Sequence, residues 1–361
     1  MAMADFFILS ASVPEEYSKW LKLYNSWVNR DPFAHPLYCS LFVNDSTEAK
    51  CAVLSSDYGK VLYPFLLRNI SSEEYAINIV PELYDLMSPY GYGGAYIISV
   101  TDKVKLYELF TGKFEEWATN ERVVSEVIKF HLFDEDILAY SGQKDNTMDN
   151  IVVDLLQDAD VIWTQFDYKV RKNVNKAKRS GLTFLTDTSG KYLDSFLNIY
   201  YSTLDRRSAK ENYYFNTDFF RKIIDKMHDY FVFFHVLKED KIISSELCLT
   251  SNRYIYSYLG GTSADYFDLR PNDFLKHHII LWGKENNKTK FVIGGGNQKD
   301  DTLFKYKKSF APNGVYKFYV GTRIYDPNLY KLLIESKHEV LLKNHGIEWT
   351  PKEGFVPEYR T

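Results

Sequence analysis

Residues 289–310 combine three features that could hold an anionic or polarised group. An apolar run at 291–293, typical of a buried strand, leads into three consecutive glycines and then into a polar segment rich in lysine. Glycine has no Cβ atom, so the backbone can take unusual angles and a ligand can approach closely. Backbone N–H groups of such a turn, together with nearby lysines, suit an anion. The glycines and lysines are Gly294, Gly295, Gly296, Lys305, Lys307 and Lys308.

The same stretch also fits a tight turn with a solvated basic face, and its local chemistry leaves both interpretations open. No Gly-Lys-Ser/Thr follows at the spacing of a phosphate-binding P-loop, and the glycines do not form a dinucleotide-binding fingerprint. Asp300 and Asp301 are residue types that cap a helix N-terminus, so a helix is expected to carry the lysines.

A second group of cations lies at residues 167–181. Val170, Val174 and Ala177 recur at helical spacing, and Gly181 is a residue type that ends helices. The cations that cover the rest of this helix are Lys169, Arg171, Lys172, Lys176, Lys178 and Arg179. A solvated face explains them, and so does a phosphate-binding surface for a nucleotide-linked precursor or RNA. In the second interpretation Arg171 and Lys176 bind the diphosphate of that precursor.

Composition excludes several classes of protein. The net charge of −4 gives no general nucleic-acid-binding surface, so any RNA contact needs a local basic patch and DNA is not an expected partner. The 3 cysteines form no CxxC pair and the 8 histidines show no metal-site spacing, so we expect free thiols and no metal. The first residues, Met-Ala-Met-Ala-Asp, lack a signal peptide's basic region, and no apolar run could span a bilayer. A cytoplasmic protein, working near a membrane in some settings, is the expectation.

The elements that must position these residues occur in a repeated order. The first half predicts a helix at 14–30, a hairpin at 49–55 and 60–67, a glycine–aromatic loop at 88–96, a helix at 102–118 and a strand at 122–132. The second half predicts strands at 231–238, 241–250 and 253–259, a glycine pair at 260–261, a helix from 271 and a strand at 290–294. The repeat predicts two related α/β units with mixed sheets, at residues 1–155 and 156–361.

Several motifs occur in the order found in the FemAB-like branch of the GNAT acyltransferase superfamily, which the sequence resembles from about residue 88 onwards. The motifs are Ser88-Pro-Tyr-Gly-Tyr-Gly-Gly94, Arg171-Lys-Asn-Val-Asn-Lys-Ala177, Ser245-Glu-Leu247, Tyr258-Leu-Gly-Gly261, Arg270-Pro271, Gly294-Gly-Gly296, Tyr306-Lys-Lys-Ser-Phe310 and Phe355-Val-Pro-Glu-Tyr-Arg360.

The resemblance implies tandem GNAT-like units around a cleft, with the last segment packing back on the first unit. It also implies transfer of an acyl or aminoacyl group to an amine. Characterised relatives use aminoacyl-tRNA to extend the side peptide of peptidoglycan precursors, and others resemble acyl-CoA enzymes of surface sugars. This sequence lacks the usual acetyl-CoA pyrophosphate loop and also the long coiled-coil insertion of some tRNA-dependent relatives. Acyl-CoA and aminoacyl-tRNA therefore both remain candidate donors, and no tightly bound cofactor is expected.

Acyl transfer requires an aligned neutral amine, a stabilised oxyanion and a proton for the leaving group. Lys307 matches the lysine of the family's aromatic-Lys-x-x-Phe motif and is the candidate for stabilising negative charge or holding the donor. Glu246 lies in an apolar strand; if it points inward it must be paired or have a raised pKa, as a general base has, and if outward it is solvated. Tyr258 is the third catalytic candidate, as a hydrogen-bond donor to an oxyanion or leaving group.

The remaining candidates are assigned to the acceptor or the donor. Tyr90 and Tyr92 belong to the glycine–aromatic loop, and Arg270 precedes a helix that starts at a proline. Arg270 binds phosphate or forms a structural ion pair. Asn297 and Asp301 bind the acceptor or cap the following helix. Gly294, Gly295, Gly296 and Lys305 are assigned to the donor.

Three functions remain in view. The first is a FemAB-like transferase acting on a small or lipid-linked cell-envelope precursor, with tRNA as a possible partner. The second is an acetyl-CoA-dependent N-acetyltransferase of a nucleotide- or lipid-linked amino sugar. The third is a catalytically silent binding protein with the same fold.

Overall fold

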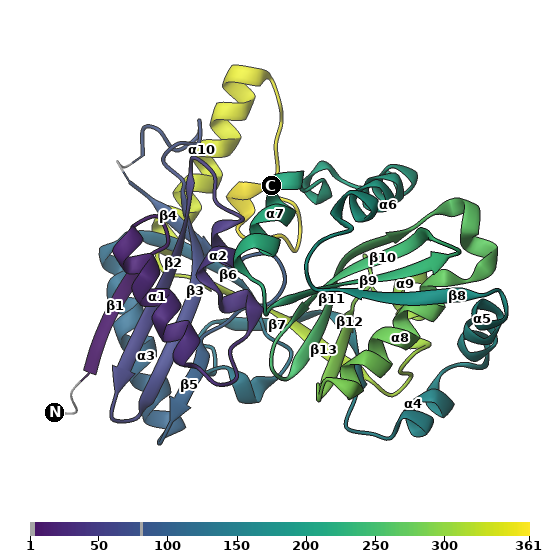
Figure 1. Cartoon of the computed structure of the whole chain (residues 1–361). Coiled ribbons are helices and arrows are strands. Elements are labelled where there is room, and N and C mark those ends of the chain that lie inside the picture. Colours follow the sequence, from purple (N-terminus) through teal and green to yellow (C-terminus); the bar gives the residue numbers. More distant parts are fainter. Residues whose placement is uncertain (1–3, 80–81) are drawn as a thin grey trace. The chain divides into compact units, whose positions relative to one another are not determined.

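The computed structural model describes residues 4–79 and 82–361 and divides the chain into two compact units (Figure 1). Unit 1 contains residues 1–147 and 318–361, and unit 2 contains residues 148–317. Unit 1 is thus assembled from two separate stretches of sequence. Residues 1–3 of the N-terminal segment, where we expect no signal peptide, lie outside the described residues.

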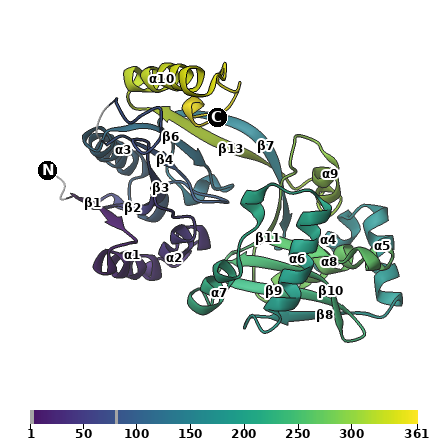
Figure 2. The same ribbon diagram turned by 90° about the horizontal axis from the view of Figure 1, so that it is seen from above.

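Unit 1 is a mixed sheet with helices on both faces. Its strands are β1 (Ala4–Ser10), β2 (Thr47–Ser56), β3 (Gly59–Asn69), β4 (Tyr84–Met87), β5 (Tyr96–Val100), β6 (Val123–Lys129) and β13 (Val315–Ile324). Its helices are α1 (Pro14–Ser26), α2 (Pro36–Ser40), α3 (Lys103–Asn120) and α10 (Pro327–His345). The strand order is β1-β2-β3-β4-β6-β13, with β5 paired to β3, and only β4 and β6 run parallel. Figure 2 shows α1 and α2 on one face and α3 and α10 on the other.

Unit 2 has the same plan. Its strands are β7 (Gln143–Asp154), β8 (Leu182–Asp187), β9 (Phe231–Lys238), β10 (Lys241–Thr250), β11 (Tyr254–Thr262) and β12 (Lys290–Gly294). Its helices are α4 (Ala159–Gln165), α5 (Tyr168–Arg179), α6 (Leu193–Arg206), α7 (Thr217–Lys226), α8 (Pro271–Glu285) and α9 (Thr302–Lys308). The strand order is β8-β9-β10-β11-β12-β7, and only β11 and β12 run parallel.

The two units repeat one topology. In each, four neighbouring antiparallel strands are followed by a crossing helix, α3 or α8, and then by a parallel strand, β6 or β12; in unit 1 the additional strand β5 comes before the helix. An antiparallel strand then completes the sheet, β13 in unit 1 and β7 in unit 2. This order confirms the prediction of two related α/β units. The strands β7 and β13 are also the segments in which the chain passes from one unit to the other.

The first helix is shorter than expected. We predicted a helix over 14–30, but α1 ends at Ser26, and Trp27 leaves the helix with an extended backbone. Trp27 is buried against the rings of Tyr24 and Tyr96, whereas Val28 is exposed. Packing of Trp27 therefore determines the end of the helix, five residues before the Asp31-Pro32 stop signal.

The glycine pair at 260–261 lies within a strand rather than in a loop. We predicted that the strand stops at 259, but β11 continues to Thr262. A Cβ atom on Gly261 would lie 2.4 Å from Thr203 Oγ1 and 2.8 Å from the carbonyl oxygen of Ile199, both on α6. The glycine is required because α6 packs directly on the strand backbone.

The core of unit 2 lies between its sheet and the helices α4, α5, α8 and α9. The predicted inward stripe of α5, Val170, Val174 and Ala177, is buried in this cluster. Gly181 follows the helix with φ +71, a backbone conformation that glycine adopts readily. The cationic face of α5 is thereby held outward while its apolar face is anchored.

Candidate active site

The glycine turn of unit 2 holds Lys307 by a hydrogen bond. Gly294 ends β12 with φ +89, and the Lys307 ammonium donates to the carbonyl oxygen of Gly295 at 2.6 Å. A Cβ atom on Gly295 would lie 2.9 Å from the carbonyl oxygen of Asp149, and one on Gly294 would lie 3.2 Å from Lys307 Nζ. Close approach of β7 and of Lys307 therefore explains these two glycines.

Asp301 fixes the helix that carries Lys307. Its carboxylate accepts hydrogen bonds from the backbone N–H groups of Phe304, Asn297 and Gln298. These bonds lower the pKa of Asp301, that from Phe304 most strongly. Asp301 is thus the N-cap of α9 and also closes the turn that precedes it. Its capping role is observed; acceptor binding by Asp301 or the exposed Asn297 stays a prediction.

Glu246 points inward from β10 and is paired with a lysine of α8. Its two carboxylate oxygens accept from Lys276 Nζ at 2.6 and 2.7 Å. The same ammonium donates to Ser257 Oγ of β11 at 2.8 Å. Glu246 and Lys276 are each about 5% exposed, so the ion pair is held away from bulk water. Of the alternatives considered for Glu246, the structure shows the inward, paired one.

Lys307 lies within electrostatic reach of this ion pair. The pKa of Lys307 is lowered to about 8, mainly by burial and then by the positive charge of Lys276, while Glu246 and Asp301 oppose the change. The group of Glu246, Lys276 and Lys307 therefore contains one carboxylate and two amines. A group of this kind has an excess of positive charge when Lys307 is protonated, and it can supply a proton near neutral pH.

Tyr258 is the extra residue of a β-bulge. In the β10–β11 ladder, Leu247 is opposite Leu259 whereas Cys248 is opposite Ser257, which leaves Tyr258 as the inserted residue. Bulges redirect side chains and are frequent beside active sites. Nearby, β11 and β12 pair over three positions only, ending at Tyr256 and Val292, although β11 continues to Thr262. The two parallel strands thus diverge at the bulge.

The other predicted residues of unit 2 lie apart from the ion pair in the helical layer or on the surface. Arg171 donates from Nη1 to the carbonyl oxygens of Thr164, at 2.7 Å, and Phe166, and so satisfies the C-terminal end of α4. Lys176 and Lys305 are exposed on α5 and α9. Arg270, which precedes Pro271, has an exposed side chain and a left-handed backbone conformation with φ 62. Phosphate binding by these residues stays a prediction.

Tyr90 and Tyr92 belong to unit 1. Tyr90 accepts a hydrogen bond at its carbonyl oxygen from the Tyr38 hydroxyl, at 2.5 Å. The ring of Tyr92 packs edge-on against Phe33 and Phe318. Both residues are half-buried in the loop between β4 and β5, where the sequence placed them. Their assignment to a substrate is still untested.

A serine, a histidine and an aspartate form a second polar cluster in unit 2. Ser245 Oγ lies 2.8 Å from His235 Nδ1, and His235 Nε2 lies 3.8 Å from an Asp187 oxygen. All three residues are buried, and burial lowers the pKa of His235 to about 4. The Asp187 carboxylate accepts hydrogen bonds from the backbone N–H groups of residues 189, 190 and 192. The cluster therefore stabilises the β8–α6 turn and presents no accessible nucleophile.

Sequence reasoning missed Lys276, Ser257 and Asp273. Lys276 follows Phe274 and Leu275 on the apolar face of α8, and a cation on such a face requires a buried partner, so the signal was present. Asp273, one turn earlier, accepts from Asn173 Nδ2 of α5 at 3.2 Å, and burial raises its pKa. The sequence does not show which carboxylate pairs with Lys276, because the pairing depends on how α8 packs on the sheet.

Residues 4–79 and 82–361 contain neither a recognisable metal site nor a membrane-spanning helix. No group of three or more histidine, cysteine, aspartate or glutamate side chains is arranged to hold a metal ion in this part of the chain. None of the helices described there is both long and apolar enough to cross a membrane.

Comparison with known proteins finds a match to one family model and similarity to several solved structures. Residues 164–308, which include Glu246, Lys276 and Lys307, match the family model "Acetyltransferase (GNAT) domain". The structure resembles FemX, with 15% identity, a TM-score of 0.61, and coverage of 88% of this chain and 98% of that chain. Comparison with curated proteins gave no match.

Two further solved structures share the fold. One is the C-terminal domain (DUF2156) of a putative lysylphosphatidylglycerol synthetase from Agrobacterium fabrum, with 14% identity and a TM-score of 0.54. The match covers 92% of this chain and 100% of that chain. The other is L-PGS from Bacillus licheniformis, with 13% identity and a TM-score of 0.54. The match covers 91% of this chain and 97% of that chain. Residues 164–308 thus match a GNAT acetyltransferase domain, and the chain shares with these solved structures a fold of two GNAT-like units.

Proposed function

We propose that the protein transfers an acyl or aminoacyl group to an amine of a cell-envelope precursor. The acceptor would be a peptidoglycan side peptide or an amino sugar of a surface polysaccharide. The observation that carries the proposal is the position of Lys307, bonded to the glycine turn beside the Glu246–Lys276 pair. The names of the structurally similar proteins, FemX and lysylphosphatidylglycerol synthetase, support an envelope substrate.

In the proposed reaction the neutral acceptor amine attacks the acyl carbonyl carbon. A C–N bond forms, the carbonyl oxygen becomes an oxyanion, and the bond to the sulfur or oxygen of the donor then breaks. The proton lost by the amine must reach the leaving thiolate or alkoxide. Lys307, with a pKa of about 8, is suited to donate a proton to the leaving group or to stabilise the oxyanion, since its charged form predominates at neutral pH.

Glu246 of β10 and Lys276 of α8 support this role of Lys307. Because Lys276 holds both oxygens of Glu246, we propose that Glu246 acts as a positioning residue that fixes the Lys276 ammonium within electrostatic reach of Lys307. Proton transfer to Glu246 as a general base stays a prediction. Tyr258, at the bulge, is the proposed hydrogen-bond donor to the oxyanion or leaving group.

The donor is proposed to lie where β11 and β12 diverge. A strand whose parallel neighbour departs offers backbone groups to an extended amide chain, such as the pantetheine of coenzyme A. The match to an acetyltransferase family supports acyl-CoA as the donor. The exposed lysines of α5 support a phosphate-rich alternative, an aminoacyl-tRNA.

Calorimetric titration with acetyl-CoA, and in parallel with CoA, tests the donor. We expect saturable binding in the micromolar range, which is lost in Gly295→Val because a side chain there meets β7. Lys299→Met, an exposed change in the same loop, serves as the control. Absence of binding at millimolar CoA would remove the acyl-CoA donor, and charged tRNA with a UDP-linked muropeptide would then be titrated.

A Lys307→Met variant tests the chemistry itself. Turnover should fall by about 10²-fold or more, as for removal of a transition-state hydrogen-bond donor, with KM changed much less. Full activity in this variant would contradict the proposed role of Lys307. It would favour chemistry elsewhere or a silent binding protein.

A further inference from the structure

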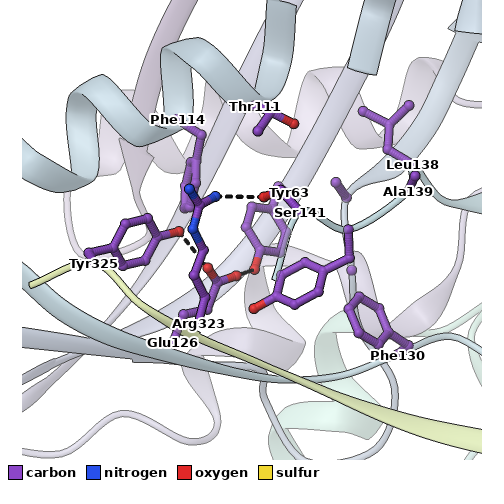
Figure 3. A pocket seen from close by; sticks show the side chains of 13 residues that line it. Tyr63, Thr111, Phe114, Glu126, Phe130, Leu138, Ala139, Ser141, Arg323 and Tyr325 are labelled. Carbon is purple, nitrogen blue, oxygen red and sulfur yellow. Dashed lines mark hydrogen bonds between the residues drawn. The ribbon is translucent and has the colours of Figure 1, made fainter. Parts of the chain in front are cut away.

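Unit 1 contains a cavity that the proposed function does not use. Its volume is about 30 Å³, and it lies between the sheet strands β3 and β6, the helix α3 and the segment around residue 140. Figure 3 shows the carboxylate of Glu126 between Tyr63 and Tyr325, with Arg323 extending past it. A water molecule needs roughly 10–15 Å³ on the same measure, so the cavity accommodates two or three atoms of that size.

The charged group in this cavity is Glu126, which is 2% exposed. One carboxylate oxygen accepts a hydrogen bond from the Tyr63 hydroxyl, and the other accepts from the Tyr325 hydroxyl at 2.5 Å. A carboxylate has about four acceptor positions, so these two donors leave capacity for others. Burial raises the pKa of Glu126, while the two tyrosines and the charge of Arg323 act in the opposite direction.

No cation is bound directly to Glu126. In residues 4–79 and 82–361 the carboxylate forms no ion pair, because the nearby guanidinium is directed elsewhere. Arg323 donates to Ser141 Oγ at 2.6 Å, and its other terminal nitrogen lies 2.6 Å from a Glu115 oxygen. Arg323 is therefore neutralised by Glu115, and the Glu126 charge is left with hydroxyl donors only.

A second polar group of the cavity has no hydrogen-bond partner among the described residues. The hydroxyl of Tyr140 is buried without a hydrogen bond, although a buried hydroxyl is normally bonded. Tyr140 lines the same cavity and interacts electrostatically with Glu126. The rings of Tyr63, Phe114 and Tyr325 also contribute to the wall. Aromatic faces around a carboxylate are the surroundings that favour an organic cation.

Unit 2 shows how the same plan accommodates a buried carboxylate. There the crossing helix α8 supplies Lys276, whose ammonium bonds both oxygens of Glu246 and the Ser257 hydroxyl. In unit 1 the crossing helix α3 supplies Thr111 and Phe114 at the cavity, and neither is cationic. A buried carboxylate beneath the crossing helix thus has an internal ammonium partner in unit 2 and an open cavity in unit 1.

We infer that the unit 1 cavity binds the ammonium group of a small alkyl amine, which donates hydrogen bonds to Glu126 and to the Tyr140 oxygen as Lys276 does to Glu246 and Ser257. The ligand is a free short amine or the aminoalkyl end of a larger molecule. The volume limits the buried part to the ammonium and one or two carbons. The inference concerns unit 1 alone and does not rest on the proposed acyl transfer.

The test is calorimetric titration of the full chain with ethylammonium chloride, at constant ionic strength set with sodium chloride. We expect saturable binding of ethylammonium and none of ethanol, its uncharged counterpart of similar size. Tetraethylammonium should not bind, because the cavity is too small for it. Butylammonium distinguishes the two sources of ligand: binding as tight as ethylammonium indicates an amine on a longer chain, and exclusion indicates a free short amine.

Glu126→Gln keeps the shape of the side chain and removes its charge, so ethylammonium binding should weaken about tenfold or more, as expected for a charge-assisted hydrogen bond. The matched control is Glu116→Gln, which removes an exposed carboxylate of α3, paired with Lys113 and not with Arg323, and should leave binding within twofold, roughly the effect of a screened surface charge. If Glu126→Gln does not fold, Tyr140→Phe replaces it, since the loss of one acceptor should weaken binding several-fold.

Three results would overturn the inference. One is the absence of ethylammonium binding to the unaltered protein at concentrations up to about 100 mM, which corresponds to a binding free energy weaker than about 1.4 kcal/mol. The second is equal binding of ethylammonium and ethanol, which would make the cavity a site for apolar groups. The third is unchanged binding in both Glu126→Gln and Tyr140→Phe, which would place the amine elsewhere.

Discussion

Lys307 is the residue whose protonation state the proposed reaction depends on. With a pKa of about 8, its charged form predominates below pH 8 and is lost as the pH rises through that value. If the charged form is required, turnover at saturating acceptor should decline above pH 8. An arginine keeps its charge to far higher pH, so Lys307→Arg should move the decline upward even if it lowers the maximum rate. Steady-state rates between pH 6 and 10 measure this, and an unchanged decline in the arginine variant would contradict it.

Lys276 should matter for stability as well as for chemistry. In Lys276→Met, Glu246 keeps its burial but loses its cation, which costs about 3–5 kcal/mol of unfolding free energy. Adding Glu246→Gln should restore much of the loss, because the uncompensated charge is then removed. Urea denaturation of the single and double variants measures both values. Lys222→Met, which breaks the exposed pair with Asp218, should cost less than about 1 kcal/mol and is the control.

At the scale of elements, the contact of α6 with β11 depends on the absence of a side chain at Gly261. Gly261→Val should displace α6, because Thr203 Oγ1 and the Ile199 carbonyl occupy the space. We expect a loss of about 1–3 kcal/mol, measured as a lower midpoint of thermal unfolding. Gly112→Ala on α3 meets no atom within 4 Å and should instead stabilise the helix by about 0.5–1 kcal/mol. Equal effects of the two changes would contradict this account.

Most elements could be predicted from the sequence because their signals are local. The strands at 231–238 and 241–250, the basic helix and the Asp301 cap follow from hydrophobic periodicity and turn chemistry. The early end of α1 and the course of β11 through its glycines could not be predicted, because Trp27 and Gly261 respond to tertiary neighbours. The Lys276–Glu246 pair was missed for the same reason. Its partners are thirty residues apart, and each signal alone is ambiguous.

At the scale of the molecule, the last residues of the chain stabilise unit 1. Arg360 donates from Nε to the buried Asp85 at 3.0 Å and also pairs with Glu73, while Tyr359 is fully buried and bonds Ser125 at 2.7 Å. Tyr359→Ala should therefore destabilise unit 1 by about 3–5 kcal/mol, the cost of removing a large buried ring. Hydrogen exchange should accelerate in β6 and not in β12. Phe355→Ala, an exposed ring of the same segment, should leave both strands protected.

The divided composition of unit 1 also has a consequence for biosynthesis. A ribosome releases residues 1–147 first, but β13 and α10 of the same unit emerge about 170 to 200 residues later. At about 5–20 residues per second, this delay is on the order of ten to forty seconds. During that interval β6 lacks its neighbour β13, and a strand edge without its neighbour promotes aggregation. Unit 2 is continuous, so it can fold as soon as residue 317 has emerged. Nascent chains should accordingly acquire a protease-resistant unit 2 before unit 1, reversing the order in which the units begin in the sequence.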